Sequence, residues 1–412
     1  MSKKPNIRFK GFSDDWEQRK LGELVSFSKG SGYSKGDLKG NGTPIILYGR
    51  LYTKYETVIS EVDTYVDEKP GSVHSIGGEV IVPGSGETAE DISIASVVEK
   101  PGILLGGDLN VITPPDNINS AFLAISISNG KPHSDMAKMA QGKSVVHLHN
   151  SDLAKIDFPY PTHEEQCEIS EYFSNIDRLI TLHQRKCDKL KELKKHMLKK
   201  MFPKNNEKFP EYRFDGFTDP WEQCKLGDIL ISLQNNTLSR AELSHEAGVA
   251  KNVHYGDVLI KFGEVLDVSK EKLPMISDEI VLSKYKASFL QNGDVIVADT
   301  AEDSTVGKCS EIAGLNDEVV LSGLHTIPYR PIEKFASGYL GYYLNSSAYH
   351  NQLIPLMQGI KVTSISKSAM QDTDIVYPKS VEEQGKIGDY FQSLDHLITL
   401  HRRKYFSLFI IS

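Results

Sequence analysis

The chain has 412 residues, of which 39% are hydrophobic and 25% are charged, so it is long enough for two or more ordinary globular domains. No stretch approaches the roughly eighteen apolar residues that a membrane helix needs, and the opening residues lack the apolar core of a signal peptide, so we expect a cytoplasmic protein without membrane contact. The net charge of -8 argues against a protein covered with nucleic acid, and the scattered cysteines Cys167, Cys187, Cys224 and Cys309 indicate neither a disulfide framework nor a zinc site.

The first globular segment is predicted to cover residues 1–161 and to be rich in strands. Apolar runs bounded by turn residues predict strands at 43–48 and 78–82, and a helix is expected at 120–128. A Gln141-Gly142 pair follows, and an extended Asp-x-x-Tyr-Pro stretch at 157–161 closes the segment. Its proline favours a turn into a new helix.

A helix of unusual length is predicted from about Glu164 to Phe202, within a spacer at 162–204. No proline or glycine interrupts this run before Pro203, so at about 1.5 Å per residue the helix would be roughly 60 Å long, too long to be hidden inside one small domain. Apolar or near-apolar residues recur at alternating steps of three and four, which is typical of a coiled-coil seam. The seam residues of this helix are Ile169, Phe173, Ile176, Ile180, His183, Cys187, Leu190, Met197 and Met201.

Basic residues dominate the second half of this helix. Between Arg185 and Lys204, nine lysines and arginines are opposed only by Asp188 and Glu192. Such a run is often the solvated face of a helix. The other interpretation, which the sequence leaves open, is a local patch that contacts phosphate or a partner subunit.

The rest of the chain repeats the first part. Twelve residues of the opening, from Pro5 to Gly22, return 205 positions later, and they include the only two tryptophans, Trp16 and Trp221. The helix motif Leu-Ile-Thr-Leu-His returns 218 positions later, so the second globular segment, at 205–378, is 13 residues longer than the first. A repeat of this length is a domain duplication.

The second segment is expected to follow the same plan as the first. A strand is predicted at 293–297 and a helix at about 332–345, followed by a Gln358-Gly359 pair and an Asp-x-x-Tyr-Pro stretch at 374–378. The framing motifs agree between the two segments, whereas their interiors diverge. Two copies of one scaffold with different loops would recognise two different things.

The last segment, 379–412, is predicted to be a second copy of the long helix, with seam residues at Phe391, Leu394 and Ile398. We expect the first long helix to pack against this second copy within the same chain, and not against another copy of the protein in a homodimer. The second copy is expected to stop soon after His401, because the residues that follow are apolar and lack the lysine-rich run of the first copy. The C-terminal helix is therefore predicted to be shortened.

No catalytic motif stands out. Gln141-Gly142-Lys143-Ser144 resembles the end of a phosphate-binding loop but lacks the first glycine of that motif, since Ala137 occupies its position. The stretch at 163–167 lacks the second histidine of a zinc protease, and its acidic pair is better explained by a helix start, with Thr162 as the N-cap and Glu165 completing a capping box. The sequence thus favours a binding protein, without catalytic or metal-ligating residues.

Polar loops offer the chemistry that reads nucleic acid. Basic and aromatic residues are interleaved with glycine between Ser26 and Tyr55, and the corresponding part of the second segment is similar. Long cations can pair with phosphate or guanine edges, and Asn suits adenine. Any soluble surface loop could also have this composition. The candidate DNA-binding residues are Lys29, Lys35, Lys39, Tyr48, Arg50, Tyr52, Lys143, Asn235, Arg240, Lys251, Lys261 and Lys361.

These motifs, in this order and twice over, resemble the DNA-specificity subunits of Type I restriction-modification systems. The resemblance rests on the Trp-Glu-Gln-x-Lys-Leu-Gly openings at Trp16 and Trp221, the two Gln-Gly pairs, and the two Glu-Glu-Gln helices with Asp177 or Asp395 before Leu-Ile-Thr-Leu-His. It covers essentially the whole chain. It implies an α+β fold with a pseudo-twofold internal repeat, in which two strand-rich target-recognition domains are separated by two long helices packed as an antiparallel coiled coil.

The resemblance also implies a function in phage defence. Each domain would bind one half of an asymmetric bipartite site in double-stranded DNA, and the helices would set the gap. The subunit would be non-catalytic and without its own cofactor. Two modification subunits would bind S-adenosylmethionine and methylate adenine, and motor and nuclease subunits would use ATP and Mg.

Two alternatives remain at this point. The chain could be a scaffold for protein partners, with two adaptor domains on a helical spacer and no role for DNA, in which case its binding would lack the steep salt dependence of phosphate contacts. It could also be a fused enzyme with an unrecognised active site, which assays of the isolated chain for methyl transfer and nuclease activity would reveal.

Overall fold

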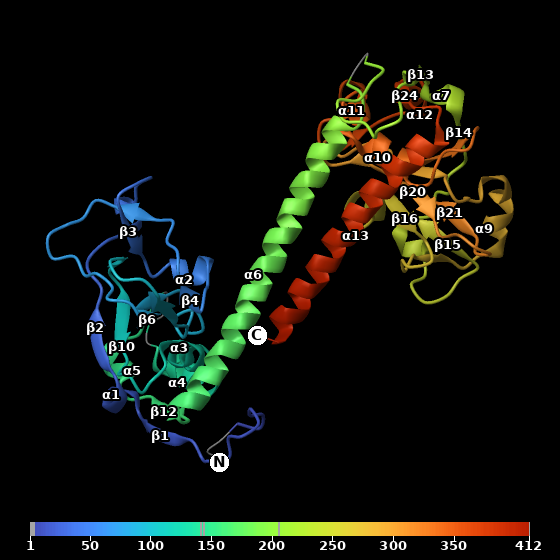
Figure 1. Ribbon diagram of the computed structural model, residues 1–412. Coiled ribbons are helices and arrows are strands. Elements are labelled where there is room, and N and C mark those ends of the chain that lie inside the picture. Colours follow the sequence, from blue (N-terminus) through green and yellow to red (C-terminus); the bar gives the residue numbers. More distant parts are fainter. Residues whose placement is uncertain (1–4, 141, 143–144, 205–206, 412) are drawn as a thin grey trace. The chain divides into compact units, whose positions relative to one another are not determined.

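The computed structural model describes residues 5–140, 142, 145–204 and 207–411 (Figure 1). The chain divides into two compact units. The first contains residues 1–182 and 405–412, and the second contains residues 183–404. The two long helices, α6 and α13, contribute to both units. Within the described residues, no helix is long and apolar enough to span a membrane.

Among its described residues, the first unit contains twelve strands and the helices between them. Its strands are β1 (Glu17–Lys20), β2 (Ser26–Lys29), β3 (Thr43–Ile46), β4 (Val58–Ile59), β5 (Tyr65–Val66), β6 (Glu79–Pro83), β7 (Ser85–Gly86), β8 (Ser96–Val98), β9 (Leu104–Leu105), β10 (Leu109–Thr113), β11 (Val146–His147) and β12 (Asp157–Tyr160). Its helices are α1 (Leu21–Leu24), η1 (Lys35–Asp37), α2 (Arg50–Thr53), α3 (Ser120–Ser128), α4 (Gly130–Met139), α5 (Asn150–Leu153) and the start of α6 (His163–Lys200).

The second unit repeats this series strand by strand. Its strands are β13 (Glu222–Lys225), β14 (Leu230–Ser232), β15 (Ala250–Val253), β16 (Val265–Asp267), β17 (Met275–Ile276), β18 (Val295–Ala298), β19 (Thr300–Ala301), β20 (Cys309–Ala313), β21 (Val320–Ser322), β22 (Thr326–Pro331), β23 (Thr363–Ser364) and β24 (Asp374–Tyr377). Its helices are α7 (Leu226–Ile229), η2 (Arg240–Glu242), α8 (Tyr255–Ile260), α9 (Glu279–Lys284), η3 (Lys286–Ser288), α10 (Tyr339–Asn345), α11 (Ser347–His350), η4 (Ile354–Leu356), α12 (Lys367–Gln371) and α13 (Val381–Ile411).

Both units have the same sheet topology. A five-stranded sheet has the order β2-β10-β6-β8-β4 in the first unit and β14-β22-β18-β20-β16 in the second, and a three-stranded sheet, β5-β3-β9 or β17-β15-β21, accompanies it. Most neighbours are antiparallel, but β4 with β8 and β3 with β9 are parallel in the first unit, as are β16 with β20 and β15 with β21 in the second. Buried Val and Ile side chains from β6 and β18 lie at the centre of each core. The predicted strands at 43–48, 78–82 and 293–297 are confirmed as β3, β6 and β18.

The recurring framing motifs contact one another in each unit. The Trp-Glu-Gln opening forms β1, which pairs with the Asp-x-x-Tyr strand β12, and β13 pairs with β24 in the equivalent register. Arg8 forms a bidentate ion pair with Glu165 at 2.8 and 2.6 Å, and Arg213 repeats it with Glu383 at 2.7 and 2.9 Å. These pairs join the opening of each unit to the first turn of its long helix, so the framing residues recur because they close the fold.

The glutamine of each Glu-Glu-Gln motif has a similar structural role. The Gln166 side chain donates to the Pro161 carbonyl at 3.0 Å and accepts from the Asn119 amide at 2.9 Å. Gln384 does the same with Pro378 at 2.8 Å and Ala336 at 3.0 Å. Both glutamines are buried, and a buried polar group with satisfied hydrogen bonds stabilises the packing around it.

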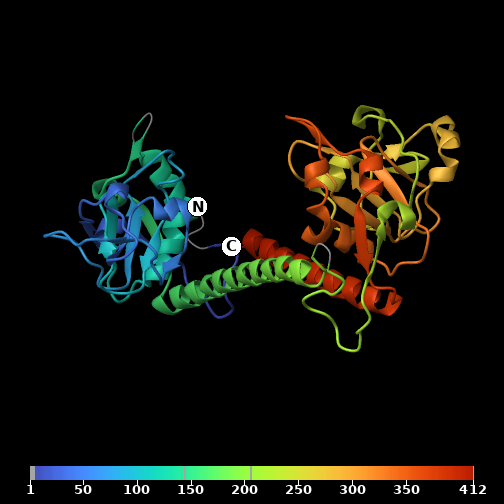
Figure 2. The same cartoon turned by 90° about the horizontal axis from the view of Figure 1, so that it is seen from above.

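The long helices differ from the prediction at one end. Helix α6 is continuous from His163 to Lys200, as Figure 2 shows, and its start is capped by Thr162, whose hydroxyl accepts from the Glu165 amide at 3.5 Å. The expectation that the second helix stops soon after His401 was wrong. Helix α13 continues to Ile411, because no proline or glycine lies beyond Gly388 and aromatic or aliphatic residues are compatible with a helix. In the second unit, the predicted helix at 332–345 is helical only from Tyr339.

The two tryptophans provide a test of the framing contacts. Trp221 is 1% exposed and its indole N–H donates to the Glu383 carboxylate at 3.1 Å, whereas the buried indole nitrogen of Trp16 has no hydrogen-bond partner in the described part of the chain. We expect Trp221→Phe to lower the free energy of unfolding by about 2–3 kcal/mol, since a hydrogen bond to a charged group is lost. Trp16→Phe, the matched control, should cost about 1 kcal/mol or less. Equal losses in urea unfolding would contradict the assignment.

Candidate nucleic-acid interface

Each unit carries one non-glycine residue in the left-handed backbone region, and the two occupy equivalent places. Asp108 (φ 59°) directly precedes β10, and His325 (φ 55°) directly precedes β22. They are the only such residues in the described chain. A positive φ is unfavourable for residues with a Cβ, and such conformations cluster at functional sites.

In the first unit, Asp108 lies beside Gly84, the residue that connects β6 to β7. Its carbonyl accepts from the Gly84 amide at 2.6 Å, and its carboxylate accepts from the Ser85 hydroxyl at 2.5 Å. The phenol of Tyr52 on α2 donates to the Ser85 carbonyl, and its half-buried position raises its pKa well above the ordinary value. Lys29, exposed at the end of β2, brings its ammonium group beside Gly84. Lys29, Tyr52, Ser85 and Asp108 form what we call the first crossover site.

In the second unit, His325 lies beside Asp299, the residue that connects β18 to β19. Its carbonyl accepts from the Asp299 amide at 3.1 Å, as Asp108 does from Gly84. Its ring Nδ1 lies 3.5 Å from the Asp299 carboxylate and 3.4 Å from the Thr300 hydroxyl, which itself donates to that carboxylate at 2.7 Å. The Tyr255 ring on α8 meets the His325 ring edge-on at 5.3 Å. Tyr255, Asp299, Thr300 and His325 form the second crossover site.

The two crossover sites share a backbone arrangement and differ in part of their side chains. Each contains a tyrosine and an aspartate, but the first adds a lysine and a serine, whereas the second adds a histidine and a threonine. Hydroxyl, carboxylate, imidazole and ammonium groups are donors and acceptors suited to the edges of base pairs, and lysine also suits phosphate. The arrangement can therefore read polar ligands of two different patterns with one scaffold.

Each crossover site adjoins a loop that begins with the Gln-Gly pair. The loop ends in β11 in the first unit and in β23 in the second. Strand β11 pairs with β7, and β23 pairs with β19, so β7 and β19 hold the ends of these loops. Gly142 and Gly359 both have positive φ, 145° and 119°. Gln141 and the candidate residue Lys143 lie outside the described residues.

Three of the predicted DNA-binding residues are occupied inside their own units. Arg50 is 8% exposed and its guanidinium is held by Asp63 at 2.6 Å and Glu56 at 2.8 Å. Lys251 pairs with Glu318 at 2.7 Å and donates to the Val268 carbonyl, and the Asn235 amide donates to the Gly323 carbonyl at 3.2 Å. In this structure these three residues therefore make contacts within their own unit, and their assignment to DNA stays a prediction.

The other predicted residues lie at or near the surface. Lys39, Arg240 and Lys261 are exposed but paired with Asp67, Asp257 and Glu271 respectively. Tyr48 is exposed, and its ring meets that of Tyr52 at 6.0 Å. Lys29, Lys35 and Lys361 are exposed and have no ion-pair partner among the residues that the structure describes. Of the predicted set, only Lys29 and Tyr52 belong to a crossover site.

Sequence reasoning missed Ser85, Asp108, Asp299, Thr300 and His325, and it placed Tyr255 in a polar region of the second segment without choosing it as a candidate. Gly84-Ser85-Gly86 has the composition of a turn and nothing more specific. A left-handed aspartate or histidine has no signature in a single sequence, because the same residue types are common in ordinary loops. Alignment of the two units on β10 and β22 would have brought Asp108 and His325 together.

The spacer seam is divided between different contacts. Ile169 packs against the core of the first unit, where Ile176 is also buried, while Phe173 and Ile180 are half-buried. Leu190, Met197, Phe391 and Leu394 all belong to or pack on the core of the second unit. The seam therefore differs from a simple helix-to-helix stripe, because several of its residues face a globular core.

Within the second unit, α6 and α13 run antiparallel and are joined by three contacts. His183 faces His401 with their Nδ1 atoms 2.8 Å apart, Cys187 lies against the Ile398 carbonyl, and Lys194 binds Asp395. The partner residue number falls as the α6 number rises, as antiparallel packing requires.

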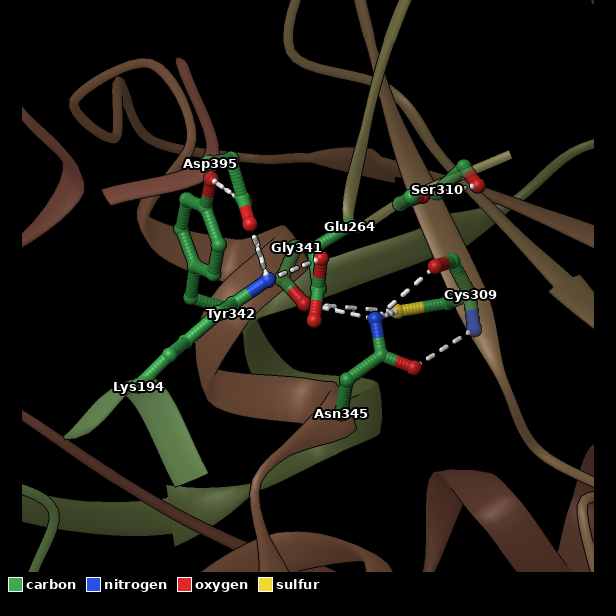
Figure 3. Close-up of polar contacts among 9 residues, drawn as sticks. Lys194, Glu264, Cys309, Ser310, Gly341, Tyr342, Asn345 and Asp395 are labelled. Atoms are coloured by element: carbon green, nitrogen blue, oxygen red, sulfur yellow. Dashed lines mark hydrogen bonds and ion pairs between the residues drawn. The ribbon is translucent and has the colours of Figure 1, made fainter. Parts of the chain in front are cut away.

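Lys194 is the centre of the strongest of these contacts (Figure 3). Its ammonium lies 2.7 and 2.8 Å from the Asp395 carboxylate oxygens and 2.8 Å from Glu264, and the Tyr342 hydroxyl donates to Asp395 at 2.7 Å. The side chain of Lys194 is 14% exposed. Burial and the Asp395 charge raise the pKa of Tyr342 far above its ordinary value, so its phenol stays a donor. Of the basic run at 185–204, this lysine is used internally.

The equivalent aspartate of the first unit has a simpler environment. Asp177 accepts one hydrogen bond, from the Thr57 hydroxyl at 2.9 Å, and its burial raises its pKa above the ordinary value. Asp177 and Asp395 are separated by the 218 residues of the helix repeat. The duplicated helix therefore keeps its aspartate in both copies, but only the second copy binds a lysine.

The histidine pair predicts a pH response of the helix contact. Burial, His183 and the nearby Lys186 and Lys404 lower the pKa of His401 below 6.5, so the folded protein favours the neutral ring. As the pH falls, the unfolded chain takes up this proton at a higher pH than the folded protein does. The contribution of neutral His401 to the free energy of unfolding is therefore present above about pH 6.5 and is lost as the pH falls through the folded pKa. We expect the Tm difference between wild type and His401→Gln to shrink between pH 7.5 and pH 5. A Tm difference that stays constant between pH 7.5 and pH 5 would contradict the prediction.

A family model, relatives and solved structures that are similar to this chain belong to Type I restriction-modification systems. A family model described as "Type I restriction modification DNA specificity domain" matches residues 13–192 and again 218–408. The chain is 24% identical over 401 residues to the Type I restriction enzyme MjaVIII specificity subunit of Methanocaldococcus jannaschii, with 95% of this chain and 88% of that protein covered. Over a shorter region of 223 residues, covering 51% of this chain and 48% of the other, it is 23% identical to the MjaIX specificity subunit of the same organism.

Two solved structures share the fold. The S subunit of a Type I restriction-modification system from M. genitalium superposes with a TM-score of 0.58 at 14% identity, covering 96% of this chain and 94% of that one. A chain from a study of complex assembly and conformational transition of the type I R-M system gives a TM-score of 0.52 at 15% identity, covering 99% and 97%.

Proposed function

We propose, because the chain belongs to the family of Type I restriction modification DNA specificity domains and carries that domain twice, that its two units each read one half of an asymmetric bipartite sequence in double-stranded DNA. The protein is a specificity subunit, which directs the chemistry of other subunits and does not perform it. The observation that carries the proposal is the pair of crossover sites, in which one backbone presents two different sets of polar side chains.

The proposed role assigns the remaining parts of the chain. Residues 1–161 and 205–378 are the target-recognition domains, and residues 162–204 and 379–412 form the helical spacer that sets the unspecified gap. Two modification subunits, which bind S-adenosylmethionine and methylate adenine, attach to the chain, and motor and nuclease subunits that use ATP and Mg join through them. The DNA substrate implies action in the cytoplasm.

The test is a competition experiment with the full chain and its modification subunit. A library of duplexes randomised over 30 base pairs should yield, after selection, one motif with two specified halves and a fixed gap. Altering either half of the selected duplex should weaken binding by about fivefold to a hundredfold per changed base pair, at roughly 1–3 kcal/mol each. Equal binding to all duplexes in the presence of competitor DNA would exclude the proposed function.

The competing function is a scaffold that binds only proteins. Salt distinguishes the two, because phosphate contacts release counterions and make the logarithm of the affinity fall linearly with the logarithm of the salt concentration. Lys29, Lys35 and Lys361 are exposed and pair with no acidic side chain in the described part of the chain, which favours the DNA function. An affinity that is independent of salt would favour the scaffold.

A further inference from the structure

The Gln-Gly loop of the second unit forms a short, firmly held finger. Gln358 and Ser364 exchange backbone hydrogen bonds at 2.9 and 2.8 Å across its base. Strand β23 pairs with β19, and the Thr363 hydroxyl donates to the carbonyls of Ala301 at 3.2 Å and Asp303 at 3.0 Å. The backbone on both sides of the finger is therefore fixed.

Glycine is required where the finger begins. Gly359 has φ +119°, and a Cβ at this position would lie 2.0 Å from the carbonyl oxygen of Val362. The chain reverses too tightly there for any side chain. The same requirement for glycine recurs at Gly142 in the first unit, where a Cβ would lie 1.9 Å from the Val145 carbonyl.

The tip of the second finger is apolar and fully exposed. Ile360 is 101% exposed, Val362 is 53% exposed, and Lys361 stands between them without an ion-pair partner among the described residues. An isoleucine that is completely exposed on a pre-ordered loop gives nothing to folding. Its exposure costs solvation free energy unless a ligand covers it.

We propose that Ile360 is a specificity-determining contact that inserts against the base pairs of the second half-site, with Lys361 pairing with the adjacent phosphate. This inference rests on the proposed function. Apolar side chains read the thymine methyl group in the major groove or wedge between base steps in the minor groove, and both uses need a narrow, rigid tip. At the corresponding positions of the first unit the sequence has Lys143 and Ser144, so the two fingers would differ in what they favour.

The finger fits DNA better than it fits a protein surface. A stable protein interface buries roughly 800 Å² on each partner, which two aliphatic side chains on a loop of seven residues cannot supply. The finger also leads into the second crossover site, because β23 pairs with β19 at Thr300 and the Ile365 amide donates to the Asp299 carbonyl at 2.9 Å. The polar reading groups and the apolar tip are thus neighbours on one framework.

The test uses the duplex selected with the wild-type complex, labelled for fluorescence anisotropy. Ile360→Ala should bind it about tenfold to thirtyfold more weakly, which corresponds to the loss of about two buried methylene equivalents, and should tolerate base changes only in the second half. Its salt slope should be unchanged. Lys361→Ala should weaken binding to all sequences and lower the salt slope by about one.

The matched control is Ile280→Ala, since Ile280 is 70% exposed in the same unit but lies on α9, which carries no residue of the finger or of the second crossover site. It should bind as wild type does. If wild type selects a bipartite sequence and Ile360→Ala binds it with unchanged affinity and selectivity, the inference is overturned and the proposed function stands. If Ile360→Ala instead weakens assembly with the modification subunit alone, the finger is a protein contact and the inference is again overturned. If wild type selects no sequence, both fail.

Discussion

Replacement of Lys194 by Met is expected to lower the free energy of unfolding of the second unit by about 2–3 kcal/mol. The Lys194 ammonium lies less than 3 Å from the carboxylate of Asp395 and less than 3 Å from that of Glu264, and its side chain is largely buried. Removing one member of a buried ion pair leaves uncompensated charge, which costs about 3–5 kcal/mol in fully buried cases. The cost is smaller here, because the Asp395 side chain is 36% exposed and solvent screens part of its charge.

The control is the next residue along α6, Lys195, which is exposed. Lys195→Met should leave the free energy of unfolding within about 0.5 kcal/mol of wild type. A double variant that also carries Asp395→Asn should recover part of the loss, since the repulsion between Asp395 and Glu264 is relieved. Equal effects of Lys194→Met and Lys195→Met in urea unfolding would show that the network contributes nothing.

Insertion of four residues into α6 near Leu190 is expected to lengthen the gap between the two recognised half-sequences and leave the half-sequences unchanged. Four residues add about one helical turn, or roughly 6 Å, compared with about 3.4 Å per base pair, so the expected change is about one to two base pairs. The α6 residues on either side pack on different cores, Ile169 on the first and Met197 on the second. Selection from the randomised duplex library measures both the halves and the gap.

A matched insertion in an exposed turn separates this effect from general damage. Four residues placed after Lys69, in the turn between β5 and β6, should leave the gap unchanged. If the insertion in α6 alters the half-sequences themselves, or abolishes selection while the protein still folds, the helix does not set the gap.

The sequence was most informative where local patterns dominate. The unbroken three-and-four periodicity predicted α6 to within two residues at each end, and α3 was predicted with its observed bounds. The repeat itself predicted that two units share one fold. It could not show that Trp221 and Glu383 touch, or that Arg8 reaches Glu165, because these partners are more than 150 residues apart. Such contacts explain why the framing residues recur.

The candidate site was harder to predict because charge alone does not tell where a side chain is used. Arg50 and Lys251 have the residue types that bind phosphate, yet each is held by carboxylates from its own unit. Asp108 and His325 were missed because their importance lies in a backbone conformation that their neighbours impose. The end of α13 was misjudged for the opposite reason, since apolar composition was taken as a stop although nothing in 402–411 breaks a helix.

The contrast between Asp177 and Asp395 has a structural consequence. Helix α13 is fastened to the second unit by a carboxylate that holds a lysine and a tyrosine, whereas at the equivalent position α6 is fastened to the first unit by a single hydrogen bond from Thr57. Two aspartates of common origin therefore differ in their polar partners, and loss of the aspartate would remove more contacts around the helix in the second unit than in the first.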